Sequence, residues 1–160
     1  MDTKFHFRTI READKAWITE VATKLWGSTE IISKDHTYDI LSLPNIIAER
    51  DEKPVGFVMY AIEGEKFEIV ALFVEVENQG IGTELLDRVK EQAKTSGCTN
   101  VWLMTTNDNT KALRFYQKQG FVITVIRTNV ISEQRKLKPI PFLGYDGIEI
   151  RDEIELEILI

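Results

Sequence analysis

The sequence is poor in the side chains that form disulfides and metal clusters. Its 160 residues include one cysteine, Cys98, and two histidines, His6 and His36. A single cysteine cannot form an internal disulfide or a cysteine-based metal cluster, and two histidines leave little for a His-rich site. We therefore expect no metal ion in this protein.

An excess of positive charge is also absent. The chain has 20 Lys and Arg against 26 Asp and Glu, which gives a net charge of −6. This balance does not favour capture of nucleic acid or of an anionic membrane, and it fits a cationic small molecule slightly better. No apolar run approaches the length of a membrane span, and the N-terminus alternates like a strand, without the apolar core of a signal peptide. We expect a cytoplasmic location.

The composition is that of an ordinary globular protein. Hydrophobic residues make up 43% of the chain and charged residues 29%, which is enough to bury a sizeable core. The chain has no internal repeat and no low-complexity tract. Because the length suits one domain, we expect residues 1–160 to form a single domain.

Periodicity predicts the elements of the first half of the chain. Residues 4–10 are typical of a strand, and residues 12–26 of an amphipathic helix that ends at Gly27. Residues 28–43 show little periodicity, so we predict a loop with at most one short helix there. Short turns then join three strands into an antiparallel meander over residues 45–50, 55–62 and 66–74.

Helices and strands alternate in the second half. A helix follows Gly80, with Ile81, Leu85, Val89 and Ala93 on one face. The alternation of strands and helices favours an α/β fold. In the final segment, isoleucine and leucine alternate with charged residues, which predicts a strand with one face in solvent. The remaining predicted elements are a strand over residues 99–106, a helix from Asn109 to about Gln119, a strand over 121–130 and the final strand over 148–160.

The segment Gln79-Gly80-Ile81-Gly82-Thr83 joins a predicted strand to a predicted helix. Its glycines let backbone amides approach a ligand, and the start of a helix carries a partial positive charge, so the segment suits a pyrophosphate. A plain strand-to-helix turn is the alternative. A dinucleotide-binding fingerprint fits poorly because a leucine occupies the third glycine position, and the ending of a P-loop is missing.

A second segment runs from Asn109 to Phe121. Asn109 and Tyr116 are seven residues apart, about two helical turns, so both side chains project from the same side and could contact one ligand. The alternative is structural: Phe115 and Tyr116 form an aromatic pair in the core, and Asn109 only caps the helix.

Together these two segments resemble the GNAT superfamily of acyl-CoA-dependent N-acetyltransferases. The family pattern is Gln/Arg-x-x-Gly-x-Gly/Ala after a strand, followed by Asn-x-x-Ala-x-x-Phe-Tyr-x-x-x-Gly-Phe. The second half is matched at every fixed position, and the resemblance covers residues 66–121. Glu77 and Asn78 depart from the first half. Since a carboxylate would repel a pyrophosphate, we expect Glu77 to turn toward solvent.

The resemblance implies a mixed, mostly antiparallel sheet flanked by helices on both faces. It also implies acetyl-CoA, or another short acyl-CoA, as co-substrate, with transfer of the acyl group to a primary amine by direct attack in a ternary complex. Tyr116 would then be the acid that protonates the leaving thiolate. The implied cofactor contacts are Phe73, Val74, Gln79, Gly80, Ile81, Gly82, Thr83 and Asn109.

The base is proposed from position on a strand. Glu68 lies on the strand that leads to the cofactor loop and could accept a proton through water, and Glu75 is the second candidate. The alternative for Glu68 is a surface charge on an edge strand.

The resemblance also suggests a lining for the acceptor pocket, because this family places the first helix region and the last strands there. The candidates for this lining are Trp26, Glu30, His36 and Asp152.

Several choices stay open at this point. Cys98 could form an acyl-enzyme, but its place after the helix favours a buried small residue. The cluster of Arg135, Lys136 and Lys138 could meet the adenosine phosphate or form a solvated turn.

The acceptor is expected to be a small molecule or a peptide that carries an amine, for example a polyamine, an aminoglycoside or a lysine side chain. A homodimer is possible. The alternatives to an enzyme are a non-catalytic acyl-CoA-binding or regulatory domain and a protein-interaction domain that keeps only the fold.

Overall fold

The computed structural model describes residues 5–34 and 36–160. The described chain divides into two compact units, the first ending at Thr99 and the second spanning Asn100–Ile160. We describe each unit by itself. That the whole chain acts as one domain stays a prediction.

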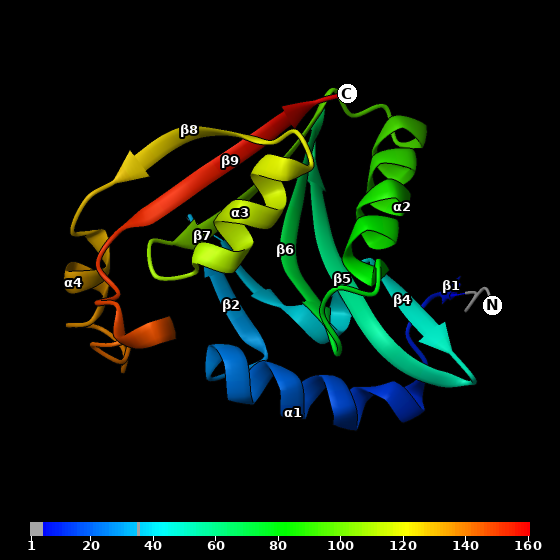
Figure 1. The fold of residues 1–160 in the computed structure, drawn as a ribbon, viewed down its shortest axis with the longest axis horizontal. Helices are drawn as coiled ribbons and strands as arrows, with labels where there is room; N and C mark the ends of the chain where they lie inside the picture. Colours follow the sequence, from blue (N-terminus) through cyan, green and yellow to red (C-terminus); the bar gives the residue numbers. More distant parts are fainter. Residues whose placement is uncertain (1–4, 35) are drawn as a thin grey trace. The chain divides into compact units, whose positions relative to one another are not determined.

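The first unit contains an antiparallel sheet with the strand order β1-β4-β5-β6 (Figure 1). The predicted meander is confirmed, since short turns join β4 to β5 and β5 to β6. The predicted first strand is present but shorter than residues 4–10, of which residue 4 lies outside the described residues. The strands are β1 (His6–Arg8), β4 (Asn45–Arg50), β5 (Lys53–Glu63) and β6 (Lys66–Val74).

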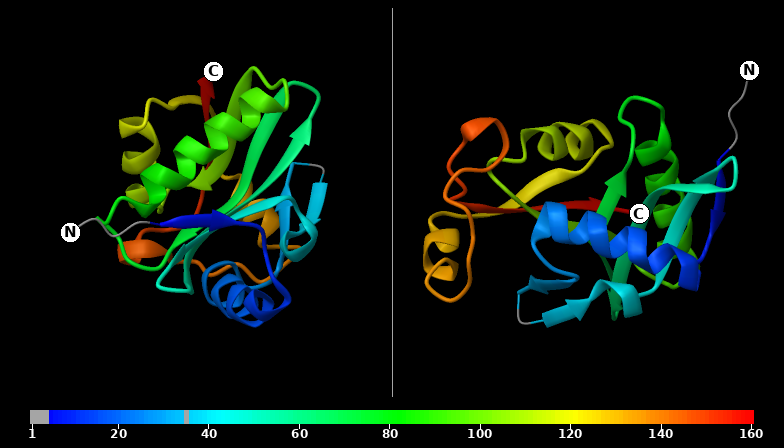
Figure 2. Two further views of the ribbon diagram at one scale, coloured as in Figure 1. Left: turned by 90° about the vertical axis from the view of Figure 1, so that its right-hand side faces the viewer. Right: turned by 90° about the horizontal axis from the view of Figure 1, so that it is seen from below.

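Two helices cover opposite faces of this sheet (Figure 2). Phe57 of β5 packs with Ile18 of α1 in one buried cluster, whereas the neighbouring Gly56 faces Leu85 of α2. Successive residues of a strand point to opposite faces, so β5 contacts both helices. The predicted helix over residues 12–26 begins as a short 3-10 turn (Glu12–Asp14). The helices are α1 (Lys15–Trp26), which ends at Gly27 with φ 81°, and α2 (Ile81–Thr95).

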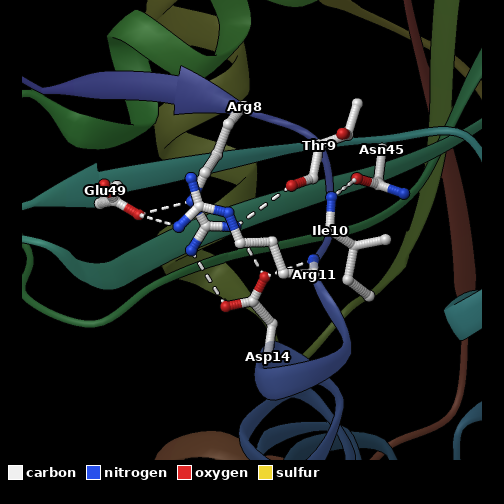
Figure 3. A network of polar contacts seen from close by, with 7 residues as sticks. All are labelled: Arg8, Thr9, Ile10, Arg11, Asp14, Asn45 and Glu49. Atoms are coloured by element: carbon white, nitrogen blue, oxygen red, sulfur yellow. Dashed lines mark hydrogen bonds and ion pairs between the residues drawn. The ribbon is translucent and has the colours of Figure 1, made fainter.

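A polar cluster fixes the start of the first unit (Figure 3). The Arg8 guanidinium donates to both carboxylate oxygens of Asp14, at 2.7 and 3.0 Å, and also to Glu49. The guanidinium is the largest cause that lowers the pKa of Asp14 below its usual value. Nearby, Asn45 accepts the backbone N–H of Ile10 at 2.7 Å. These bonds join β1, β4 and the start of α1, which positions the helix on the sheet.

The prediction of a loop over residues 28–43 is wrong. This segment forms an antiparallel hairpin of β2 (Glu30–Ser33) and β3 (His36–Asp39), followed by a 3-10 turn (Ile40–Ser42). Only the short helical turn agrees with the sequence prediction. The hairpin carries both polar and apolar residues on each strand, so it lacks a clean period-two pattern of hydrophobicity.

The second unit contains an antiparallel sheet with the strand order β7-β9-β8 (Figure 1). The predicted last strand over residues 148–160 is confirmed only from Glu153, and the predicted strand over 121–130 ends at Arg127, where the chain turns into α4. The elements are β7 (Asn100–Thr106), α3 (Thr110–Lys118), β8 (Val122–Arg127), α4 (Val130–Gln134), a 3-10 turn (Tyr145–Gly147) and β9 (Glu153–Leu159).

The expectation that the last strand exposes one face to solvent is wrong. β9 is the middle strand of this sheet, and its charged residues are not free in solvent: Glu155 is buried and Glu157 is half-buried. Arg127 pairs with Glu155, and the Asn100 side chain donates to Glu157 at 2.8 Å. The charged residues that suggested solvent are therefore satisfied by partners inside the unit.

The fold class predicted from the sequence is confirmed, with mostly antiparallel strands and helices that cover sheet faces (Figures 1 and 2). Among residues 5–34 and 36–160, no helix is both long enough and apolar enough to cross a lipid bilayer.

Candidate functional site

Glu68 is a buried carboxylate in the middle of the first unit. It lies on β6 opposite Ala61 of β5, and only 5% of it is exposed. Ser33 donates a short hydrogen bond to Oε2, and the Tyr38 hydroxyl donates to Oε1 at 3.3 Å. Burial raises the pKa of Glu68, and the bonds from Ser33 and Tyr38 oppose that rise. The alternative interpretation of Glu68 as an exposed edge charge is therefore wrong.

The second candidate base has different surroundings. Glu75 follows the end of β6 and is exposed, and its backbone N–H donates to the carbonyl of Val55 at 2.8 Å. Glu75 therefore lacks the buried surroundings that Glu68 has. Burial thus favours Glu68 over Glu75.

The loop before α2 turns through left-handed backbone conformations into the start of a helix. Asn78 and Gly80 both have positive φ, 62° and 81°, and Gly80 is the N-cap of α2. A Cβ at Gly80 would meet no atom within 4 Å, so the space beside this backbone is open. The helix then begins with the amides of Ile81, Gly82 and Thr83, and helix starts attract anions.

Charges around this loop have both signs. Glu77 is exposed, as expected, so its carboxylate can point into water. Arg50, from the end of β4, donates to the side-chain oxygen of Gln79 at 2.7 Å. The loop thus combines helix-start amides, open space and one neighbouring cation, and these features fit a diphosphate.

The end of β6 carries the two other predicted cofactor residues of the first unit. Phe73 and Val74 pair in register with Phe57 and Gly56 of β5. The Phe73 ring also packs on the rings of Phe57 and Trp17, with centroids 5.7 and 6.0 Å away. Side-chain packing therefore holds the backbone of this strand end in place.

In the second unit, Tyr116 and Asn109 occupy the two ends of α3. Tyr116 is buried, and its ring packs edge-on against Phe115 and Phe121. Burial raises the pKa of the Tyr116 phenol above its usual value. Asn109 caps α3 by accepting the backbone N–H of Ala112 at 3.2 Å. The aromatic pair and the cap are thus both present, and the cofactor roles of these residues stay predictions.

The predicted acceptor residues of the first unit lie on its first helix and its hairpin. Trp26, at the end of α1, packs edge-on against Phe57 and is partly exposed. His36 stacks on Tyr38 with ring centroids 5.5 Å apart, and its Nε2 lies 3.2 Å from Glu63. Glu30 is exposed on β2. The hairpin therefore connects His36, through Tyr38, with Glu68.

The other candidates have structural partners. Cys98 is buried, as expected, and burial raises the pKa of its thiol, which makes it a poor nucleophile. Asp152 accepts the backbone N–H of Asn129 at 2.9 Å and pairs with Arg151. Within the described residues, no group of three or more His, Cys, Asp or Glu side chains could hold a metal ion.

The members of the basic cluster of Arg135, Lys136 and Lys138 have different surroundings. Arg135 donates to the carbonyls of Ile140, Pro141 and Ile150 at 2.8 to 3.0 Å, so it holds the segment before β9. Lys136 pairs with Glu133 on the surface. The interpretation of this cluster as a solvated turn is therefore wrong for Arg135.

Sequence reasoning missed Ser33, Tyr38 and Arg50. The first two belong to the hairpin that was predicted as a loop, and the third lies at a strand end far from the loop in sequence. The one signal for the hairpin was the pair of short segments Glu30–Ser33 and His36–Asp39, which contain β-branched and aromatic residues on either side of a two-residue connection.

Curated relatives match most of the chain. An uncharacterized protein of Bacillus subtilis, YdhI, is 38% identical over 145 residues, which cover 89% of this chain and 91% of the relative. Spermidine N(1)-acetyltransferase of Thermoplasma acidophilum is 29% identical over 111 residues, which cover 68% of this chain and 67% of the relative.

A solved structure shares the fold along the whole chain. The structure of a GNAT family acetyltransferase from Elizabethkingia anophelis with acetyl-CoA bound has a TM-score of 0.69 and 25% identity, and the match covers 100% of both chains. The model of the acetyltransferase (GNAT) family matches residues 10–121, more than half of the sequence. The resemblance found in the two motifs is thus confirmed, and the chain belongs to the GNAT family of acetyltransferases.

Proposed function

We propose that the protein transfers an acetyl group from acetyl-CoA to a primary amine by direct attack in a ternary complex. The observation that carries this proposal is the buried carboxylate of Glu68, held by Ser33 and Tyr38, in a member of a family of acetyltransferases. A buried carboxylate with a raised pKa suits a general base that works near neutral pH. Cys98, buried with a raised thiol pKa, supports direct attack over an acyl-enzyme.

The proposed cofactor contacts follow the family pattern. The backbone of Phe73 and Val74 would pair with the pantetheine arm, and the amides from Gln79 to Thr83 would hold the diphosphate. Hydrogen bonds to a charged group contribute about 1.5 to 3 kcal/mol each, so several amides can anchor the cofactor without a metal. Asn109 would contact the pantetheine from the start of α3.

The proposed chemistry requires two proton transfers. An amine attacks the thioester carbon only in its neutral form, and it loses a proton as the C–N bond forms and the C–S bond breaks. Glu68 would accept that proton, directly or through water, and Tyr116 would donate one to the departing thiolate. A phenol is protonated at neutral pH, as a proton donor must be, and burial makes Tyr116 a weaker acid than an exposed tyrosine.

The acceptor is proposed as a cationic amine. The proposed lining residues Glu30 and His36, with the neighbouring Glu63, bring two carboxylates to the hairpin side of the first unit. Trp26 would add an aromatic surface, which attracts cations. The relative from Thermoplasma acidophilum bears the name of an enzyme that acetylates spermidine, a polyamine, which supports this class of acceptor.

Three measurements test this function. We expect acetyl-CoA to raise the melting temperature, and thiol release to be seen with at least one amine of a panel of spermidine, an aminoglycoside and a lysine peptide. Initial rates that vary with both substrates should give intersecting rather than parallel reciprocal plots, as a ternary complex requires. No stabilisation at millimolar acetyl-CoA would remove every function that binds this cofactor. Stabilisation without turnover would favour the second candidate, a non-catalytic acyl-CoA-binding domain.

The Tyr116→Phe variant should lose about 10- to 100-fold in kcat, because the thiolate then leaves without a proton donor. A thiol has a pKa of about 8.5, so it departs with modest help and the reaction is not abolished. Acetyl-CoA affinity should stay within about twofold, since the ring is kept. Kinetics and calorimetric titration measure the two values, and an unchanged kcat would show that Tyr116 is not the acid.

The Gly80→Val variant should weaken acetyl-CoA binding by at least about tenfold. A bulky side chain at this position covers the open space beside the amides, and loss of one charge-assisted hydrogen bond costs about 1.5 kcal/mol or more. Gly64→Val is the matched control, because Gly64 also has positive φ, 60°, and open space, but lies in the turn between β5 and β6. Both variants carry similar backbone strain. Equal loss of affinity in both would place the diphosphate elsewhere.

A further inference from the structure

The β2–β3 hairpin supplies a hydrogen-bond donor to each oxygen of one buried carboxylate. Ser33 of β2 donates to Oε2 of Glu68, and Tyr38 of β3 donates to Oε1 at 3.3 Å. The hairpin register pairs Ser33 with His36 and Ile31 with Tyr38, so these four side chains share one face. Ser33 and Glu68 are 4% and 5% exposed, which excludes water from most of this contact.

We propose that the hairpin positions and tunes the base: Ser33 and Tyr38 hold Glu68 in one orientation and stabilise its ionised form. They act through Glu68 and are positioning residues. The proposal rests on the proposed role of Glu68 as the general base. A hydrogen-bond donor favours the charged form of its acceptor, so each donor makes Glu68 available as a base at a lower pH than burial alone would allow.

Other charged groups of the hairpin and of β5 face this contact. Lys34 and His36 favour the ionised form of Glu68, in the same direction as the two hydroxyls. On the other side, Glu63 of β5 lies 3.2 Å from His36 and also acts on Tyr38. His36 and Glu63 are both exposed, so water screens their effects, whereas Ser33 and Tyr38 bond the carboxylate directly.

The Tyr38 hydroxyl stays protonated, so it remains a hydrogen-bond donor to Glu68. Burial and the charge of Glu68 raise the pKa of the Tyr38 phenol to about 12, so it stays protonated at any pH at which the enzyme would work. Its ring stacks on His36 at an interplanar angle of 24°, which restricts the direction of the hydroxyl. The hydroxyl is therefore held protonated and directed toward the carboxylate.

The test measures the pKa of Glu68 and the activity separately, in the full chain. The carboxyl carbon of Glu68 is followed by NMR in protein labelled with ¹³C-glutamate, and its signal is assigned by its loss in Glu68→Gln. We expect Tyr38→Phe and Ser33→Ala each to raise the pKa of Glu68 by about one unit, because each removes a donor to the charged form. The acidic limb of the kcat/KM profile for a responsive amine should move to higher pH by the same amount.

Two control variants keep the test specific. Ser33→Thr retains the hydroxyl and should keep the pKa of Glu68 and the acidic limb near the wild-type values. Tyr60→Phe also removes a phenol hydroxyl from a buried ring of the first unit, which stacks on Phe67, and should move neither value. Melting temperatures of all variants identify any that fail to fold.

The outcomes separate this proposal from the proposed function. An unchanged pKa of Glu68 in both Tyr38→Phe and Ser33→Ala overturns the tuning role of the hairpin. A raised pKa of Glu68 with an unmoved acidic limb supports the hairpin contact, but shows that Glu68 is not the base. A raised pKa with a matching shift of the limb supports both.

Discussion

Replacing Glu68 by glutamine is expected to lower kcat/KM by about 10²- to 10³-fold, the contribution of a well-placed general base. Glutamine has nearly the same shape and its oxygen can still accept a bond from Ser33 or Tyr38, so the variant should fold. It cannot accept a proton from the amine. The proton that the amine loses as the C–N bond forms must then pass to water, so turnover slows while acetyl-CoA still binds.

The matched variant for this experiment is Glu75→Gln. It removes one carboxylate from the exposed end of the same strand segment, and we expect it to keep kcat/KM within about threefold. We expect acetyl-CoA to stabilise both variants as much as the wild type, which would show that the cofactor still binds. If Glu75→Gln loses activity and Glu68→Gln keeps it, then Glu75 is the base and Glu68 is not.

The parts of the fold that could be predicted from the sequence are those set by local chemistry. Gly27 ends α1 with φ 81°, and Asn109 caps α3 through a bond to an amide three residues ahead. The apolar face of α2 repeats at helical spacing, and Ile81, Leu85 and Val89 are buried as expected. Each of these features depends only on residues that are close together in the sequence. The sequence pattern is therefore enough to predict it.

The parts that were missed depend on contacts between distant residues. The partners of Glu68 are 35 and 30 residues away along the chain, in Ser33 and Tyr38. A glutamate among apolar strand residues is compatible with both an exposed edge and a buried site, and only its partners distinguish the two. The same holds for Glu155 of β9, which was expected in solvent and is buried beside Arg127.

Replacing Gly144 by alanine is expected to destabilise the protein by about 3 kcal/mol, which lowers the melting temperature of a chain of this size by about 6 to 12 °C. A Cβ at Gly144 would overlap a carboxylate oxygen of Asp108 and lie 2.8 Å from Ile150. Asp108 cannot easily move away. It is 2% exposed and accepts bonds from the Thr106 hydroxyl and from the backbone N–H of Tyr145 at 3.1 Å.

Gly147→Ala is the control, because Gly147 lies in the same turn but has open space at its Cβ position and a φ of 72°. It should cost only the strain of a left-handed residue, about 1 to 2 kcal/mol.

A double-mutant cycle can identify the cause of the Gly144 effect. Asp108→Ala alone loses the bonds to Thr106 and Tyr145, but it also removes the carboxylate that the new Cβ would strike. If the overlap with Asp108 is the main cost, the double variant should be more stable than the sum of the two single effects by about 1 kcal/mol or more. Additive losses would instead place the cost at Ile150.

Asp108 directly precedes Asn109, the cap of α3, so this contact joins the segment before β9 to the start of the helix that carries Tyr116. A less stable Gly144→Ala protein should therefore also show a larger loss of acetyl-CoA affinity than Gly147→Ala, measured at a temperature where both are folded.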